Sequence, residues 1–104
     1  TTTGGITAIN PLSQKIPERH YLYQNYPNPF NPNSKIKFQI SKLGYVELTV
    51  FDILGREVAV LVNEELKAGT YEVYFDGTNF TSGVYFYRLE AGDYTETRKM
   101  VLVK

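Results

Sequence analysis

The chain has 104 residues, 42 % of them hydrophobic, with 11 basic and 11 acidic side chains and a formal net charge of zero. This composition is that of one globular domain, and it gives no reason to expect nucleic acid or an anionic membrane as a partner. Cysteine is absent, which excludes disulfides and thiolate chemistry, and no apolar run approaches the roughly 20 residues of a membrane-spanning helix.

The N-terminal segment, residues 1–20, shows no clean hydrophobic period and is rich in Thr and Gly before it turns polar around Pro11 and Pro17. We predict that it is a mostly flexible linker from an upstream cargo domain, and that the folded domain occupies residues 21–104. The segment also lacks the basic start and apolar block of a signal peptide.

Residues 24–32 read QNYPNPFNP, with three prolines in nine positions. Proline has no N–H and a fixed φ, so this stretch is expected to be extended and ordered before it binds anything. Tyr26 and Phe30 are expected to anchor it to the core. Two interpretations stay open: the stretch is a preformed recognition segment, or it ends the first strand and closes one end of the core.

Alternation of apolar and polar residues predicts strands over residues 35–40 and 45–51. The DILGR stretch at 52–56 has Asp at the first position of a turn and Gly where φ is positive, which predicts a short hairpin with a bulge. The return strand, residues 57–62, is predicted to place its three valines on one face. Residues 63–69 are expected to form one helical turn or a loop.

Three further strands are predicted at 70–76, 84–90 and 94–103, separated by glycine-containing turns. Residues 84–90 carry large apolar side chains on both faces, which indicates either a covered central strand or an exposed aromatic stripe. With the segment around residues 21–26 there are about seven strands. Because turns recur every 8 to 12 residues or so, the fold class is expected to be all-β, an Ig-like antiparallel β-sandwich.

No pattern of residues indicates catalysis. His20 is the only histidine, so a histidine-based metal cluster is excluded and no catalytic triad is recognisable. The turn carboxylates are expected to cap their own turns; they are Asp52, Asp76 and Asp93. A weak calcium site at Asp76, Thr78 and Asn79 is the alternative for one of them. We therefore expect a non-enzymatic module without a metal or cofactor.

The basic residues near the C-terminus form the one notable cluster. Arg98 and Lys99 are adjacent, and Lys104 is the last residue. They are expected on a solvated strand edge, where lysine also deters pairing between molecules.

An ordered series of short motifs covers the chain from about residue 22 to residue 104 and resembles the type A C-terminal sorting domain of the type IX secretion system. The stretches that carry the resemblance are QNYPNPFNP (24–32), IKF (36–38), VELTVFDILGREV (46–58), AGTY (68–71), FDG (75–77), SGVYFYRL (82–89) and KMVLVK (99–104). The chain departs from the family pattern at Phe51 and Phe75, where the family usually has Tyr and Trp, and both changes are expected to be core substitutions.

The resemblance implies a function as an address label on a secreted cargo protein. The cargo would cross the periplasm, pass the outer-membrane translocon and reach the cell surface or the medium. A sortase-like peptidase of the system would cleave the chain within residues 1–23 and join the cargo to surface lipopolysaccharide. The resemblance places recognition at Tyr26, Pro27, Asn28, Pro29, Phe30, Gly69, Tyr71, Lys99 and Lys104. No small-molecule ligand, nucleic acid or membrane insertion is implied.

Two alternative functions are compatible with the sandwich alone. The first is a structural or carbohydrate-binding Ig-like accessory module of a secreted hydrolase, against which the absence of Trp argues. The second is an assembly domain like those of flagellar hook-capping proteins, to which this Ig-like family is related.

Overall fold

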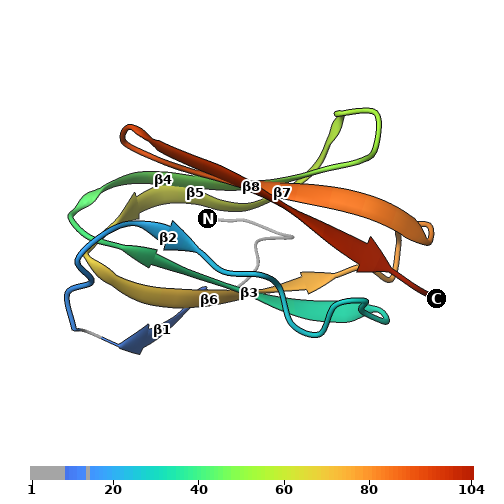
Figure 1. Ribbon diagram of the computed structural model, residues 1–104, viewed down its shortest axis with the longest axis horizontal. Coiled ribbons are helices and arrows are strands. Elements are labelled where there is room, and N and C mark those ends of the chain that lie inside the picture. Colours follow the sequence, from blue (N-terminus) through green and yellow to red (C-terminus); the bar gives the residue numbers. More distant parts are fainter. Residues whose placement is uncertain (1–8, 14) are drawn as a thin grey trace.

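The structure, a computed structural model, describes residues 9–13 and 15–104, which form an eight-stranded antiparallel β-sandwich (Figure 1). The strands are β1 (Ile9–Ser13), β2 (Tyr21–Leu22), β3 (Asn33–Ile40), β4 (Gly44–Phe51), β5 (Glu57–Leu66), β6 (Gly69–Asp76), β7 (Gly83–Ala91) and β8 (Tyr94–Leu102). The predicted fold class is confirmed, and the strand beyond the predicted seven is β1.

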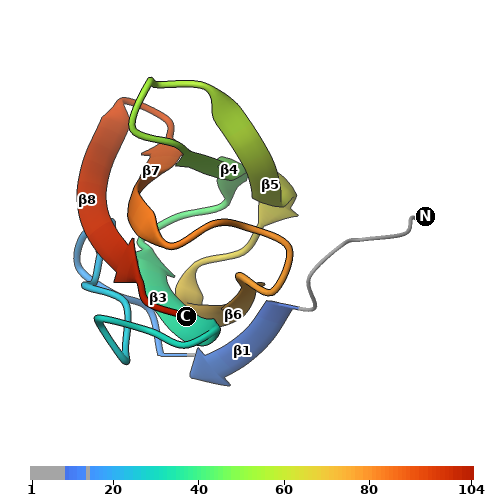
Figure 2. The same ribbon diagram turned by 90° about the vertical axis from the view of Figure 1, so that its right-hand side faces the viewer.

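Two four-stranded sheets enclose the core. One has the strand order β1-β6-β3-β2 and the other has the order β5-β4-β7-β8. Seen along the strands, β8 faces the β2–β3 edge of the first sheet, whereas β5 and β1 form the edges of the opposite side (Figure 2). The 20 buried hydrophobic side chains form one cluster between the sheets.

The inward faces follow the alternation in the sequence. Ile36, Phe38 and Ile40 of β3 are at most 1 % exposed, and the three apolar residues predicted inward on β4 are fully buried. On β6, the side chains of Tyr71 and Phe75 also lie in the core. Because a strand places alternate side chains on opposite faces, this period alone located the core side of the three strands.

Strand β7 lies between β4 and β8. Tyr85, Tyr87 and Leu89 point into the core, while the alternate side chains on its outer face are half-buried. One of these, Arg88, places its guanidinium 4.6 Å from the ring centre of Phe51. The interpretation as a central strand therefore holds, and the outer face is shielded by neighbouring side chains of the same sheet.

The prediction for β5 was wrong in two respects. Two register shifts against β4 interrupt the alternation, so Val60 is 41 % exposed and Leu61 is 5 % exposed. A bulge places two residues opposite one and reverses the face of every residue beyond it. In addition, the strand continues to Leu66, so residues 63–66 are neither a helical turn nor a loop.

The segment predicted as a flexible linker contains β1, which pairs with β6. Asn10 and Pro11 concealed it, because asparagine and proline are both depleted in strands. The proposed link from residues 1–20 to a cargo domain stays a prediction.

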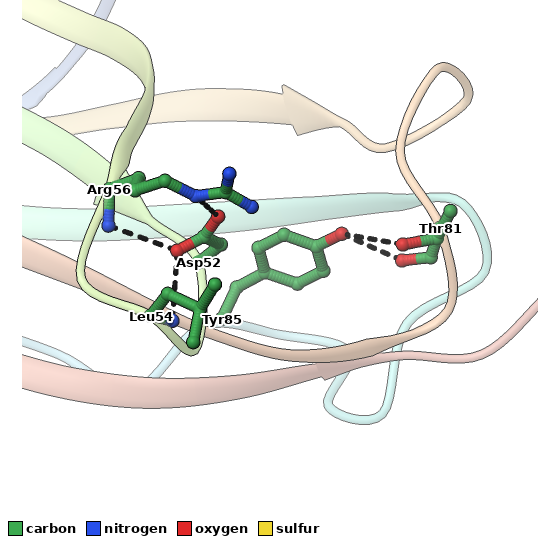
Figure 3. Close-up of polar contacts among 5 residues, drawn as sticks. All are labelled: Asp52, Leu54, Arg56, Thr81 and Tyr85. Atoms are coloured by element: carbon green, nitrogen blue, oxygen red, sulfur yellow. Dashed lines mark hydrogen bonds and ion pairs between the residues drawn. The ribbon is translucent and has the colours of Figure 1, made fainter.

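Asp52 and Asp76 cap their own turns, as predicted. One carboxylate oxygen of Asp52 accepts hydrogen bonds from the backbone N–H groups of Leu54 and Arg56, each at 2.9 Å, and the other pairs with the Arg56 guanidinium at 2.8 Å (Figure 3). Gly55 has a φ of +83° in this turn. These hydrogen bonds, first those from Arg56, hold the pKa of Asp52 below its ordinary value.

Candidate functional site

The proline-rich segment runs beside the last strand. Phe30 N–H donates to the carbonyl of Val101 and Val103 N–H donates to the carbonyl of Phe30, each at 2.9 Å. At its other end, Tyr26 exchanges two backbone hydrogen bonds with Lys35 of β3. Tyr26 and Phe30 therefore make the ladder bonds that the prolines beside them cannot make, and together they join the two sheets.

A buried polar network fixes the segment from beneath. The Asn25 side-chain amide donates to the Ser34 hydroxyl at 2.8 Å and to the carbonyl of Pro27 at 3.1 Å. The Ser34 hydroxyl donates to the same carbonyl at 2.9 Å. On the β8 side, the side-chain oxygen of Asn28 accepts from the N–H of Val101 at 3.0 Å. Each bond joins the segment to a neighbouring strand or to itself, so its backbone has little freedom left to lose on binding.

Tyr87 holds the segment from the opposite sheet. Its fully buried hydroxyl donates to the carbonyl of Tyr23 at 2.8 Å and accepts from the N–H of Asn25 at 2.7 Å. Burial raises the pKa of Tyr87 to about 12, against the opposing effect of the Asn25 N–H. One oxygen thus satisfies two backbone groups that would otherwise lack a partner.

Arg98 closes the seam between β8 and β2. Its Nε donates to the carbonyl of Leu22 at 2.7 Å, and one terminal nitrogen donates to the Tyr21 hydroxyl at 3.1 Å. The hydroxyl of Tyr94 accepts from the N–H of Leu22 at 3.2 Å. The expectation that Arg98 is only a solvated edge residue was therefore wrong, because its guanidinium joins two sheets.

The two aromatic residues predicted to belong to the site, Tyr26 and Phe30, differ in how far their side chains are exposed to solvent. The Tyr26 side chain is 77 % exposed and Phe30 is 1 % exposed. Phe30 packs edge-on against Phe75, with ring centres 5.8 Å apart. The expectation that both rings anchor the segment is therefore right for Phe30 and wrong for Tyr26, whose ring points to solvent.

The two predicted lysines belong to β8 and the residues after it, whose backbone pairs with the segment at Phe30. Lys99 is exposed, and its carbonyl accepts from the Gln24 side chain at 2.7 Å. Lys104 N–H donates to the Ser82 hydroxyl at 3.0 Å, and its ammonium donates to the carbonyl of Thr78. We call the surface formed here the motif–β8 surface; it comprises Tyr26, Pro27, Asn28, Pro29, Lys99 and Lys104.

Gly69 and Tyr71 lie away from this surface. They begin β6, whose other end, Asp76, pairs with Asn33 just after the proline-rich segment. Eight strand residues separate the two ends by about 23 Å. Tyr71 is buried, and its hydroxyl donates to the carbonyl of Lys67 at 2.7 Å. The structure therefore gives Tyr71 a role in fixing a turn, while recognition at these two residues stays a prediction.

The site contains little that could act chemically. Among residues 9–13 and 15–104, no group of three or more His, Cys, Asp or Glu side chains could hold a metal ion. The Asp76 carboxylate accepts from both the N–H and the hydroxyl of Thr78, which is a turn cap and leaves the weak calcium site without support. The same residues contain no apolar helix of membrane-spanning length.

The fold and this surface define a β-sandwich module that presents a rigid, partly aromatic and basic face. The chain belongs to the family of secretion system C-terminal sorting domains, whose family model matches residues 24–104. Domains of this family are the C-terminal sorting signal of type IX secretion cargo, and they mark proteins for export to the cell surface or the medium. A sorting-signal domain is not itself catalytic. Comparisons with curated proteins and with solved structures gave no match.

Sequence reasoning did not assign the residues that hold the motif–β8 surface in place. Asn25 and Ser34 are buried polar residues beneath it, and Tyr87 and Arg98 fix it and β2 from the second sheet. Asn25 lies inside the proline-rich motif, so its position was a usable signal. Ser34 lies seven and nine residues after its partners in the motif, whereas Tyr87 and Arg98 act through contacts more than 60 residues away in the sequence, which no local pattern predicts.

Proposed function

We propose that the outer-membrane translocon of the secretion system recognises the motif–β8 surface, and that a sortase-like peptidase of the same system cleaves the chain within residues 1–23 and joins the cargo to surface lipopolysaccharide. The observation that carries the first part is the exposure of Tyr26. A 77 % exposed ring on a backbone pinned at Asn25 and Phe30 is an aromatic contact presented at little entropic cost.

The chemistry around Tyr26 favours a protein partner. The prolines beside it are exposed and rigid, and Lys99 is exposed on the neighbouring strand. An acidic, aromatic-lined groove would complement such a surface, since prolines stack on aromatic rings and ammonium groups pair with carboxylates.

The accessibility of the chain supports cleavage between β1 and β2. Lys15, Ile16, Glu18 and Arg19 are all exposed in this connection. Exposed connections are the preferred sites of proteolytic attack, whereas β2 is held by Tyr94 and Arg98.

A reporter export assay tests recognition. The chain is fused behind a periplasmic reporter with an ordinary signal peptide, in a host that carries the secretion system, and reporter in the medium is measured. We expect Tyr26→Ser to lower export by roughly tenfold, the effect typical of losing an aromatic anchor. Tyr45→Ser is the matched control, because Tyr45 is 56 % exposed on β4, which belongs to the other sheet than the β3 strand that Tyr26 pairs with.

Point variants are preferable to deleting the last strand. Removing residues 99–104 also removes the buried side chains of Met100 and Leu102, so export would fall through unfolding alone. Lys99→Gln keeps the fold and removes the charge. Export by Tyr26→Ser and Lys99→Gln at the level of the unchanged chain would contradict recognition through this surface.

A further inference from the structure

Strand β1 contributes almost nothing to the core. Among the residues that the structure describes, the 20 buried hydrophobic side chains all lie between Leu22 and Leu102, and Ile9 is the one β1 side chain that packs partly against them. The other four β1 residues are exposed. Since burial of apolar side chains is the main stabilising contribution in such a domain, the sandwich is complete without β1.

The pairing of β1 with β6 is also weaker than the pairing of β3 with β6. Four residue pairs join β1 to β6, with a register shift between Pro11 and Ser13, whereas eight uninterrupted pairs join β3 to β6. Pro11 has no N–H to donate to the ladder. Because β3 pairs with the whole length of β6 on its other edge, β6 remains a strand whether or not β1 is present.

The connection after β1 permits its movement. Residues 15–19 are exposed, apart from the half-buried Pro17, and run from one edge of the sheet to the other, where β2 begins. Separate hydrogen bonds from Arg98 and to Tyr94 hold Leu22 of β2. Detachment of β1 consequently leaves β2 in place.

We propose that β1 is a detachable strand, and that the β6 edge beneath it is a strand-addition site for an extended peptide with an aliphatic side chain at the position of Ile9. An unpaired strand edge presents free N–H and C=O groups and accepts a further strand through main-chain hydrogen bonds. The half-buried Ile9 makes the one contact between a β1 side chain and the core, so the site should prefer a peptide with an aliphatic residue at this position.

Hydrogen exchange of the full chain tests the detachment. The β6 amides that face β1 report on β1, and the β6 amides that face β3 report on the sandwich. We expect Ile9→Asp to accelerate exchange of the first set by at least roughly tenfold and to leave the second set unchanged. Leu12→Asp is the matched control, since Leu12 is 48 % exposed on the same strand, and its effect is expected to stay within about twofold.

Adding a peptide to the Ile9→Asp chain tests the strand-addition site. A synthetic peptide with the sequence of residues 6–15 is expected to restore protection of the β1-facing amides at roughly millimolar concentration, and the same peptide with Ile9→Asp is not. Three results would overturn the proposal: unchanged exchange in Ile9→Asp, loss of protection on the β3-facing amides as well, or no restoration by the native peptide. None depends on export, so they are distinct from failure of the translocon proposal.

Discussion

Replacing Tyr87 by Phe removes one oxygen and leaves two backbone groups without their partner. The N–H of Asn25 lies in a buried residue, and the carbonyl of Tyr23 belongs to a half-buried one. An unsatisfied buried group costs about 1–3 kcal/mol, and the carbonyl, nearer to water, costs less. We expect a total loss of about 2–3 kcal/mol in the free energy of unfolding.

Urea denaturation measures this loss. With an m-value of about 1.3 kcal/mol/M for a domain of this size, the midpoint should fall by roughly 1.5–2.3 M. Tyr74→Phe is the matched control, because it removes a hydroxyl from a side chain that is 45 % exposed, and it should stay within about 0.5 kcal/mol of the unchanged chain. A midpoint shift for Tyr87→Phe no larger than for Tyr74→Phe would refute the reasoning.

The pH dependence gives a second readout of the same hydroxyl. The pKa of Tyr87 is about 12 in the folded chain because of burial, and an unfolded tyrosine titrates near its ordinary value of about 10. The unfolded chain therefore loses the proton first, so this contribution to stability is complete below pH 10 and disappears as the pH rises from 10 through 12. Tyr87→Phe should show a shallower decline over this interval than the unchanged chain.

Three further substitutions test other contacts. Gly77→Ala places a Cβ 2.9 Å from the carbonyl of Pro32 and should destabilise the domain by roughly 1–3 kcal/mol in urea denaturation. Arg98→Met removes the donor to the carbonyl of Leu22 and should lower stability by about 1.5–3 kcal/mol, with faster amide exchange in β2 first. Asp52 has a lowered pKa, caused first by its hydrogen bond from the backbone N–H of Arg56, so stability falls as the pH drops through that lowered value. Asp52→Asn should lose this acid dependence in a pH series of melting temperatures.

The regular strands could be predicted because their signal is local. On β3, β4 and β6 the inward apolar residues recur at every second position over most of the strand, which gave both the strand and its buried face, although Thr49 of β4 is buried as well. On β5 the same reasoning failed at the bulges, since a bulge depends on the partner strand and leaves no period in the sequence. Strand β1 was missed for a related reason, because it is held by the ladder of β6 and not by its own composition.

The sequence predicted the two segments that form the candidate site, but it did not predict that they lie side by side. The sequence indicated the proline-rich segment and the last strand separately, and their contact rests on pairing between Phe30 and Leu102, 72 residues apart. Long-range pairing of this kind follows from closure of the sandwich. Gly69 belongs to the same family motifs and lies at the far end, which shows that order along the chain does not imply proximity in the fold.

The unequal attachment of β1 and β2 has a mechanical consequence. A tensile load applied at residue 9 acts first on a short strand with one partly buried side chain, while the body behind it is held by twenty buried residues and the bonds of Arg98 and Tyr87. The chain should therefore yield at β1 and lengthen there before the sandwich deforms. Such a yielding point lets the chain lengthen at β1 while the face bearing Tyr26 keeps its shape.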